Sequence, residues 1–582
     1  MAHDPPPMFS NTIALCLSCL GCVVGTGNIW RFPRIVANNA GDTGGLVFLI
    51  VWFMFLMLWS IPVILIEYSV GRFTRRGPVE SFGVMLGKGY RWVGGWVFMV
   101  NLGICCYYSV VLGWCMYYFI HVIAFPLPET VEASTEIFNS MSNSYYPVLT
   151  HCCSVLFVAL IISRSVSTFE KVNMIFVPIL LAIVFGSFIY AMTLQDAIEG
   201  VKYLFRPEWS QFGKARLWVD AISQNAWDTG AGAGLFIVYS IYMPRKSGVV
   251  KFGCLIPLCN NVVSLVSAMT TMATVFHVQV AKEHLNPDEP EDLKKIVKIL
   301  SSNGEANTGL TFIWIPTLYN LLPGGRALAV FFFLCLVFAG LSSMVAQMEL
   351  VIRTLEDFGA KRKYALPCVA VVVALLGLPS SLNINVLVNQ DFVWGFGLIL
   401  SGMCLIFLVF WYGTHVGQGN GCLNMMAGAN RFRKEVVNEY GMGDWKLPVL
   451  WAFLVTFINP IEAAGMIGWW VYDQASQSDP PWWAYESETL FAAVSQWFFW
   501  ALVLISLNIF FGHKFSGGSS SYHQFDMNDD DGGDMAAGTA EVTLIRSGSS
   551  TGKLVSSMTE KTPLAESGHS RVVVYANQST YL

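Results

Sequence analysis

Two glycine-rich stretches interrupt apolar segments in which a membrane helix would otherwise run. The first covers residues 20–28 and reads LGCVVGTGN, and the second covers residues 227–234 and reads WDTGAGAG. Inside a bilayer every backbone N–H and C=O needs a partner, so uncoiled backbone is tolerated only where it lines a cavity or binds something. Uncoiled carbonyls suit a cation such as Na⁺, and the free N–H groups that open the next helix suit an anionic group. A break near the start of each half of the chain therefore predicts an ion and solute site at the membrane midplane.

Polar side chains lie in apolar segments elsewhere in the chain. Asn28 and Asn260 belong to two different apolar spans, where a carboxamide is costly unless it coordinates an ion or pairs with another group. Ser342 and Ser343 are consecutive in an otherwise apolar helix. Their hydroxyls suit a cation, and the alternative is that they donate to carbonyls of the preceding helical turn.

The composition is that of an integral membrane protein. Hydrophobic residues make up 54% and charged residues 13% of the chain, whereas soluble proteins carry about 25% charged residues. The net charge of −5 does not favour nucleic acid as a partner. No metal-binding cysteine or histidine pattern, phosphate-binding loop or nucleophile–base pair is present, so we expect neither a cofactor nor an enzyme.

The apolar segments predict an all-α protein with twelve membrane-spanning helices, because a crossing takes about 20 apolar residues. The predicted spans are 11–36, 45–70, 95–125, 148–163, 173–194, 217–243, 253–280, 325–355, 365–380, 392–414, 447–472 and 489–512. Lysine and arginine gather after the even-numbered spans, which places both termini in the cytoplasm.

The ends of the chain differ from its core. We expect a short cytoplasmic N-terminus at 1–10, a transporter domain at 11–513 and a disordered cytoplasmic tail at 514–582, which is rich in Gly, Ser, Thr and Asp. The tail ends in Ser579-Thr580-Tyr581-Leu582, which fits a C-terminal ligand of a PDZ domain. An uninterpreted polar end is the alternative. In the segment 281–322, residues 287–302 are predicted to be helical.

The first break continues into a longer motif, Gly25-Thr-Gly-Asn-Ile-Trp-Arg-Phe-Pro33, which resembles the signature of the neurotransmitter:sodium symporters, the solute carrier family six type. Shorter motifs agree at the expected places, at 66–68, 71–72, 107–108, 114, 339–343 and 355–357. The resemblance covers roughly residues 10–513. It implies the architecture of LeuT-like amino acid transporters, a five-plus-five inverted repeat whose first and sixth helices are broken. It also implies sodium-coupled symport across the cell membrane by alternating access.

The resemblance assigns the sites residue by residue. The substrate site would use the N–H groups of Thr26 and Gly27 and the hydroxyl of Tyr108 for a carboxylate. The remaining substrate-site residues would be Val23, Ile104, Trp227, Gly230, Ala233, Ser343 and Gln347. One sodium ion would be held by Gly21, Val24, Ala339, Ser342 and Ser343, and a second by Val23, Asn28, Asp228 and Asn260.

Position 25 indicates the substrate class. Amine transporters of the family carry Asp there, whereas this chain has Gly25. A substrate that brings its own carboxylate is therefore expected, namely a neutral amino acid, and Gln347 favours a large or polar one.

The resemblance also assigns two gates. Arg31 and Asp391, with Gln224 beside them, match the outer gate, and Tyr242 and Asp357 match the inner gate. The Arg and Trp that lock the inner gate in the family are missing from residues 1–11. The inner closure must therefore use other groups, or the inward-open state is easier to reach.

A second departure concerns chloride. The positions equivalent to the family's chloride site are Trp52, Gln224, Asp228, Asn260 and Ser264. Because Asp228 places a carboxylate where the halide would lie, we expect chloride-independent transport. Whether Asp228 exports a proton on the return of the empty carrier or stays charged beside a hydrogen-bond donor is open.

Two other functions remain open from the sequence. A proton-coupled permease of the same architecture would not need Asn28, Asn260, Ser342 and Ser343 together. A sensor that binds an amino acid without transporting it would fit the long tail and the altered inner gate. The identity of the amino acid, the ion stoichiometry and the oligomeric state are not determined by the sequence.

Overall fold

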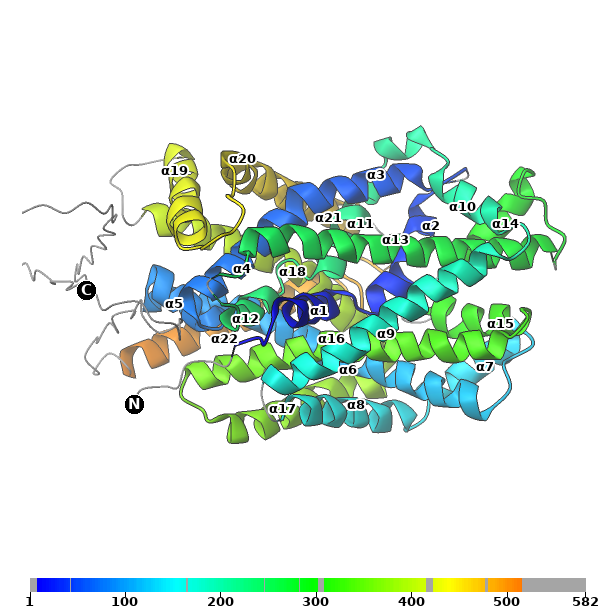
Figure 1. The fold of residues 1–582 in the computed structure, drawn as a ribbon, viewed down its shortest axis with the longest axis horizontal. Coiled ribbons are helices and arrows are strands. Elements are labelled where there is room, and N and C mark those ends of the chain that lie inside the picture. Colours follow the sequence, from blue (N-terminus) through cyan, green and yellow to red (C-terminus); the bar gives the residue numbers. More distant parts are fainter. Residues whose placement is uncertain are drawn as a thin grey trace, which may run out of the picture. The chain divides into compact units, whose positions relative to one another are not determined.

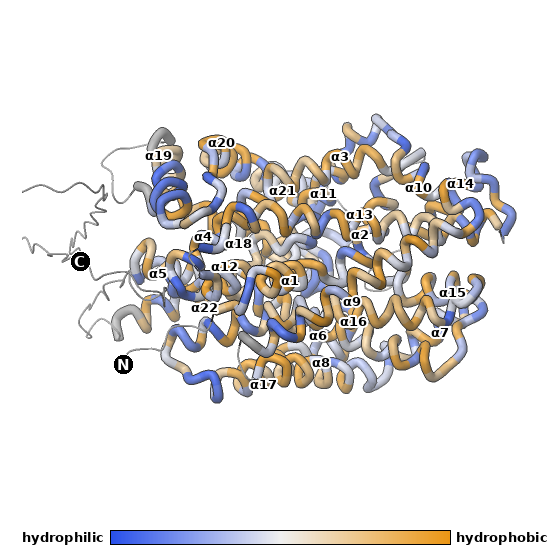
Figure 2. The backbone as a smooth tube through the Cα atoms, viewed as in Figure 1, coloured by the Kyte–Doolittle hydropathy of each residue, from blue (hydrophilic) through white to orange (hydrophobic). Residues whose placement is uncertain are grey.

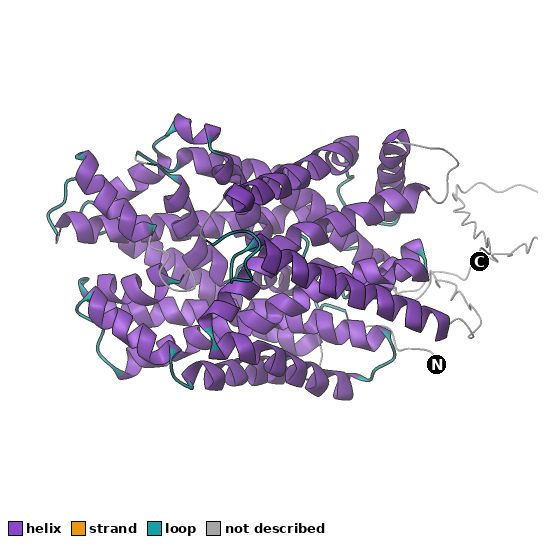
Figure 3. Cartoon of the chain, turned by 180° about the vertical axis from the view of Figure 1, so that it is seen from behind, coloured by secondary structure: helices purple, strands orange, loops and turns teal. Residues whose placement is uncertain are grey.

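The computed structural model describes residues 8–41, 43–163, 166–244, 246–281, 283–301, 308–414, 422–476 and 480–514. The predictions for residues 1–7 and for the tail beyond residue 514, including its PDZ ligand, lie outside these residues. The described part is helices joined by loops and contains no β-strand (Figure 3).

The helices run in chain order as follows (Figure 1). The first half contains α1 (Thr12–Val23), η1 (Gly27–Arg31), α2 (Phe32–Asn39), α3 (Leu46–Phe55), η2 (Leu56–Ser60), α4 (Ile61–Thr74), α5 (Pro78–Leu86), η3 (Lys88–Tyr90), α6 (Arg91–Ala124), α7 (Val131–Ser142), α8 (Tyr146–Ile162), α9 (Val166–Met192), α10 (Ala197–Phe205) and η4 (Trp209–Gly213). The second half contains α11 (Ala215–Thr229), α12 (Leu235–Ile241), α13 (Val249–Ala281), α14 (Pro290–Leu300), η6 (Leu310–Trp314), α15 (Ile315–Asn320), α16 (Gly325–Asp357), α17 (Arg362–Leu382), α18 (Ile384–Thr414), α19 (Cys422–Phe432), η7 (Arg433–Glu439), α20 (Val449–Phe453), η8 (Leu454–Ile458), α21 (Asn459–Ser476) and α22 (Leu490–Lys514).

Most predicted membrane spans correspond to helices that are long and apolar enough to cross. Within the described residues nine helices meet that condition, and two bent helix pairs raise the number to eleven. The remaining predicted span, 217–243, is divided between α11 and α12. Hydrophobic residues line the long helices, and hydrophilic ones gather in the loops at both ends (Figure 2). The predicted helix at 287–302 is present as α14.

The first predicted break is present. α1 ends at Val23, and its axis turns by 54° before the helix resumes as η1 and α2. The Gly25 N–H is satisfied locally, because it donates to Oδ1 of Asn28 at 2.8 Å. η1 is a π-helix, a form that is frequent at functional sites. The side chain of Asn28 therefore holds open the turn in which it was predicted to bind sodium.

The second break is built from glycines that adopt left-handed backbone. Gly230, Gly232 and Gly234 have φ of +67°, +94° and +75°, values that glycine adopts without the clash a β-carbon would cause. At Gly232 a β-carbon would lie only 2.5 Å from the carbonyl oxygen of Leu398. The sequence at this break is therefore dictated by both dihedral angle and space.

A buried carboxylate supplies the partners that the second break lacks. Glu67 of α4 is fully buried, and it accepts the N–H groups of Gly232 at 2.8 Å and Phe236 at 3.1 Å. The Gly232 carbonyl in turn accepts the hydroxyl of Ser401 at 2.5 Å. The uncoiled segment thus meets the bilayer's requirement through side chains of α4 and α18.

We predict that Glu67→Leu destabilises the protein, because two buried N–H groups lose their acceptor at about 1–3 kcal/mol each. Glu67→Gln retains one carbonyl acceptor and should fall between Glu67→Leu and the wild type. Thermal unfolding of the purified protein in detergent measures the order. Glu462→Gln on α21 is the control, because among the described residues this carboxylate accepts a single bond, at 3.4 Å from Asn459. Equal stability of Glu67→Leu and the control variant would contradict the assigned role.

Candidate functional site

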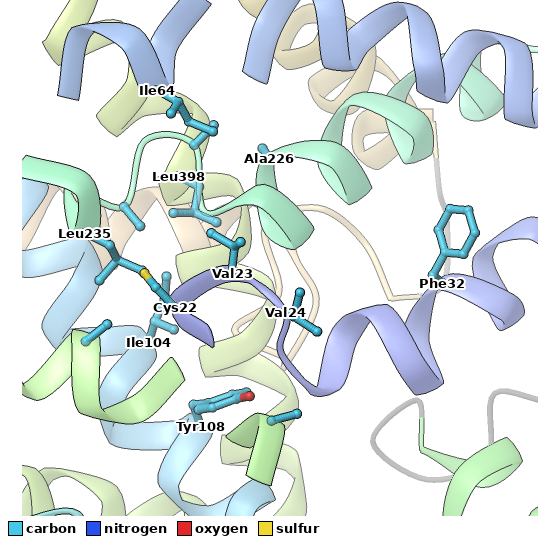
Figure 4. Close-up of a cluster of buried hydrophobic side chains, with 14 of the residues drawn as sticks. Cys22, Val23, Val24, Phe32, Ile64, Ile104, Tyr108, Ala226, Leu235 and Leu398 are labelled. Carbon is cyan, nitrogen blue, oxygen red and sulfur yellow. The ribbon is translucent and has the colours of Figure 1, made fainter. Parts of the chain in front are cut away.

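The two breaks lie beside each other at the centre of the bundle. A β-carbon at Gly230 would lie 3.8 Å from Cγ1 of Val23, and one at Gly27 would lie 3.3 Å from Oδ1 of Asp228. Figure 4 shows the interruption of α1 at Val23 and Val24 next to the turn between α11 and α12, with Ile104 and Tyr108 of α6 close by. The fold thus brings together the two segments that the sequence singled out.

The amide groups that open η1 meet Tyr108. The Thr26 N–H and the Thr26 hydroxyl donate to the Tyr108 oxygen at 3.4 and 3.1 Å. A β-carbon at Gly25 would lie 3.1 Å from Oγ of Ser343 and 3.4 Å from the Tyr108 oxygen. Amide donors at a helix start, next to a phenol and with no acidic side chain at position 25, form an arrangement that suits a carboxylate.

A second polar cluster joins η1 to α11 and α13. The Asn28 Nδ2 group donates to Oδ1 of Asn260 at 2.9 Å and to Oγ of Ser264 at 2.8 Å. Asp228 accepts from Nε2 of Gln224 at 2.7 Å and from the Ser264 hydroxyl at 3.2 Å. All five side chains are buried, and their oxygens are the ligand type that Na⁺ prefers.

One predicted member of the chloride-site equivalent is less directly connected to this cluster. Trp52 packs its ring 4.4 Å from that of Phe32, and its carbonyl accepts from Nδ2 of Asn225. Among the described residues its indole Nε1 has no hydrogen-bond partner. Trp52 therefore borders the cluster, while Gln224, Asp228, Asn260 and Ser264 form it.

The other predicted sodium ligands lie where α1 packs on α16. A β-carbon at Gly21 would lie 3.3 Å from Cβ of Ser342, so these two helices are in close contact. The Ser342 hydroxyl donates to the carbonyls of Phe338 and Ala339 at 2.9 and 3.1 Å. This is the intrahelical bonding that was the alternative reading of Ser342. It uses the hydroxyl hydrogen and leaves oxygen lone pairs for a cation.

On one side of the breaks, four side chains, including the predicted outer-gate pair, contact one another. Arg31 Nη1 lies 3.8 Å from Oδ1 of Asp391, and the Tyr107 hydroxyl donates to the same oxygen at 3.0 Å. The guanidinium of Arg31 lies 5.3 Å from the ring centre of Trp227. Trp227 also stacks on Tyr107, with an interplanar angle of 8°. These residues line a cavity together with Thr26, Tyr108 and Thr308.

Below the breaks, the two predicted inner-gate residues have separate partners. The Tyr242 hydroxyl donates to Oε1 of Glu349 at 2.8 Å. Asp357 instead accepts the Gly77 N–H at 2.6 Å and lies 3.4 Å from Arg76 Nη1. Tyr242 and Asp357 therefore do not bond directly to each other, and their role as an inner gate stays a prediction. Glu349, about two helical turns before Asp357 on α16, takes the tyrosine hydroxyl. A chain of ion pairs, in which Arg362 and Arg353 both pair with Glu356, connects Glu349 to Asp357.

Two further contacts lie on the same side of the breaks as Tyr242. Arg362 makes a two-pronged ion pair with Glu349, at 2.7 and 3.0 Å. The Phe9 N–H donates to the Tyr242 carbonyl at 3.1 Å, and the Phe9 ring lies edge-on to Phe169, Tyr239 and Tyr242. The chain thus closes this side without the missing Arg and Trp, through a phenylalanine and an ion pair.

The comparison with protein families decides the class. The model of the sodium:neurotransmitter symporter family matches residues 7–147 and 144–511. The chain belongs to this family. The family is one of sodium-coupled transporters and not of enzymes, as the sequence predicted. Membership implies sodium as the co-transported ion, a small-molecule substrate and a multi-pass membrane protein.

Relatives of this symporter share sequence along most of the chain. An uncharacterized sodium-dependent transporter of Methanocaldococcus jannaschii is 27% identical over 485 residues, which are 80% of this chain and 91% of that protein. The sodium-dependent neutral amino acid transporter B(0)AT3 of Rattus norvegicus is 25% identical over 432 residues, 61% of this chain and 68% of that protein. The crystal structure of MhsT in complex with L-phenylalanine matches with a TM-score of 0.64 at 23% identity. It covers 79% of this chain and 99% of MhsT, and it shows that the fold is shared.

Sequence reasoning assigned no role to several residues of this symporter that the structure places at or near the breaks, although two of them belong to the motifs at 66–68 and 107–108. They are Glu67, Tyr107, Glu349, Arg362 and Phe9. A signal for two of them was present, because Glu67 and Glu349 are carboxylates within apolar runs, where an ionisable group marks a functional or structural site. Phe9 carried no signal, since an apolar residue near a helix start is unremarkable in sequence.

We predict that Asp391→Asn speeds release of bound substrate to the outside, because Arg31 loses its counter-charge and Tyr107 keeps only a neutral acceptor. A partly exposed pair contributes about 0.2–1 kcal/mol, so the dissociation rate should rise up to about fivefold. Dissociation of a radiolabelled amino acid from purified protein in sodium buffer measures this. Asp288→Asn, at an 82% exposed carboxylate before α14, should match the wild type. An unchanged rate in Asp391→Asn would remove this pair from the outer gate.

Proposed function

We propose that this symporter takes up a neutral amino acid, driven by the sodium gradient, by alternating access around the paired breaks. The observation that carries the proposal is that Thr26, Gly27 and Tyr108 place amide and hydroxyl donors beside Gly25, an arrangement that suits a carboxylate. An Asp at position 25 would place its carboxyl against Tyr108 and Ser343 and serve an amine. Glycine leaves that space to the carboxylate of the substrate.

Two relatives support the same substrate class. B(0)AT3 is named a neutral amino acid transporter, and MhsT was crystallised with L-phenylalanine. Within this chain the side chains assigned to the substrate pocket, Ile104, Trp227, Gly230, Ala233 and Gln347, carry no charge. A charged amino acid would lose its hydration there without a counter-ion, which disfavours it.

Two sodium ions are proposed because two separate sets of oxygens border the first break. One set combines the carbonyls of Gly21, Val24 and Ala339 with the hydroxyls of Ser342 and Ser343. The other combines the Val23 carbonyl with Asn28, Asp228 and Asn260, next to the substrate carboxylate. A carboxylate shared by substrate and ion couples the two bindings, since each raises the affinity for the other.

We further propose that the protein lies in the cell membrane with both termini in the cytoplasm. The Lys and Arg distribution supports this orientation. The segment 514–582 would be a cytoplasmic tail whose last four residues bind a PDZ domain. Binding of the purified tail to PDZ domains is a separate test from transport.

The first experiment is uptake into proteoliposomes that contain the purified protein. We expect accumulation of a radiolabelled neutral amino acid under an inward sodium gradient and none when potassium replaces sodium. Uptake driven by a proton gradient without sodium would favour a proton-coupled permease. Sodium-dependent binding without accumulation would favour a sensor. If the protein neither takes up nor binds any amino acid in a panel of unlabelled competitors, the proposal is contradicted.

Transport is proposed to be independent of chloride, since Asp228 supplies a fixed negative charge. Two unit charges about 4 Å apart repel by about 4 kcal/mol at an effective dielectric constant near 20, so a halide and this carboxylate exclude each other. The hydrogen bonds from Gln224 and Ser264 to Asp228 support the carboxylate as the group that takes the place of the halide.

We predict that replacing chloride by gluconate leaves wild-type uptake unchanged, while Asp228→Ser makes uptake depend on chloride. The serine removes the charge and restores a hydroxyl next to Gln224 and Ser264. Asp288→Ser, away from the site, controls for the loss of one acidic group. A large fall in wild-type uptake in gluconate would refute the proposal. An Asp228→Ser protein with sodium-driven uptake that ignores chloride would refute the assignment of Asp228.

A further inference from the structure

Two carboxamide oxygens near the breaks have no hydrogen-bond partner among the residues that the structure describes. They are Oδ1 of Asn101 on α6 and Oε1 of Gln347 on α16. Asn101 is 1% exposed and Gln347 is 8% exposed, so bulk water does not reach either side chain freely. A buried polar atom without a partner costs roughly 1–3 kcal/mol, and such an atom next to a substrate site points to a ligand.

The close contacts along α6 and α16 show at which level of the bundle these two residues lie relative to Tyr108. The helices run antiparallel, since Gly340 packs on Leu112 at one level and the Asn101 side chain bonds to Gln347 at another. Between these levels, Tyr108 and Ser343 face Gly25. Asn101 and Gln347 therefore lie below the carboxylate-binding level.

The contacts around Gly234 mark the lower end of the region that contains Asn101 and Gln347. A β-carbon at Gly234 would lie 2.7 Å from Val97 and 3.3 Å from Leu350, so the second break closes against apolar side chains there. Asn101 and Gln347 thus lie between this boundary and the Tyr108 level. On α6, Asn101, Ile104 and Tyr108 share one helix face, because they are three and seven residues apart. Asn101 continues the face that already contributes Ile104 and Tyr108 to the site.

The orientation of the Asn101 amide is fixed by its neighbour. Its Nδ2 group donates to the backbone carbonyl of Gln347 at 3.0 Å, and a carbonyl only accepts, so the nitrogen must face it. Oδ1 is then obliged to be an acceptor, and the group it lacks is a donor. The same bond joins α6 to α16 at this level, so Oδ1 of Asn101 and Oε1 of Gln347 belong to residues in direct contact.

We propose that the side-chain subsite takes a neutral amino acid whose side chain carries a hydrogen-bond donor, an amide or a hydroxyl, and that Asn101 determines this preference. The inference rests on the proposed function, because it presumes an amino acid held by Thr26 and Tyr108. A purely apolar substrate leaves both oxygens unpaired in the closed site, whereas a donor satisfies at least one of them. The preference then follows from the cost of the unpaired acceptors.

An unpaired carboxamide oxygen is not by itself a binding site. Asn459 on α21 shows the same pattern, since its Nδ2 donates to the Leu58 carbonyl at 2.6 Å and its Oδ1 has no partner within the described part of the chain. Asn459 has none of the contacts that place Asn101 between the two breaks. Its replacement is therefore a matched control for removing a buried asparagine from a helix contact.

The experiment compares amino acids of nearly equal shape as inhibitors of sodium-dependent uptake in proteoliposomes. The pairs are threonine with valine, asparagine with leucine, and glutamine with methionine. For the wild type we expect the donor-bearing member of at least one pair to inhibit about tenfold better or more. In Asn101→Leu that ratio should fall at least about fivefold, whereas Asn459→Leu should keep the wild-type ratio.

The outcomes separate this inference from the function on which it rests. Sodium-dependent uptake in which the apolar member of every pair inhibits as well or better overturns the inference and leaves the proposed function standing. Loss of the ratio in Asn459→Leu as well as in Asn101→Leu also overturns it. If Asn101→Leu does not fold, Gln347→Met replaces it with the same expected fall, and the wild-type ratios remain decisive. Absence of any sodium-dependent uptake by the wild type overturns the proposed function instead.

Discussion

The requirement that every backbone polar group find a partner inside the bilayer governs the centre of this protein. Uncoiling α1 and the α11–α12 segment frees backbone amides and carbonyls, and each freed group needs a hydrogen-bond partner or a ligand. At the second break Glu67 and Ser401 supply the partners. At the first, Asn28 binds the Gly25 amide while its own Nδ2 reaches Asn260 and Ser264. The groups that remain at the first break are those that we assign to sodium and substrate.

The polar cluster around Asp228 gives the site its electrostatic character. A carboxylate hydrogen-bonded by Gln224 and Ser264 lies next to Gly27, whose N–H belongs to the proposed carboxylate site. A negative side chain and a negative substrate group this close repel unless a cation lies between them. Sodium binding and substrate binding would therefore depend on each other for an electrostatic reason as well as through a shared ligand.

Both sides of the central site are closed by contacts in the same structure. The outer side uses Arg31 with Asp391 and an aromatic stack of Tyr107 on Trp227. The inner side uses Tyr242, Glu349 and Arg362, with the Phe9 ring among other aromatic rings. Alternating access requires that one set opens while the other holds. The inner set differs from the family pattern in residue type, yet it still combines a charge pair with an aromatic plug.

The sequence alone determined the class and the two breaks, and it named most of the residues that we assign to the site. Glycine clusters in apolar runs and intramembrane carboxamides are costly in a bilayer, so their presence is informative without coordinates. The motif at 25–33 then fixed the family, and the apolar lengths predicted the helices. These features are local, because each is decided by a residue and its neighbours along the chain.

The tertiary structure decided which distant side chains meet. Glu67 bonds to the second break, Tyr242 to Glu349 rather than Asp357, and Asn101 to Gln347, over separations of 107 to 246 residues. Such pairings depend on the rotation and depth of packed helices. A one-residue register change turns a helix by about 100°, and sequence periodicity in uniformly apolar helices does not specify it.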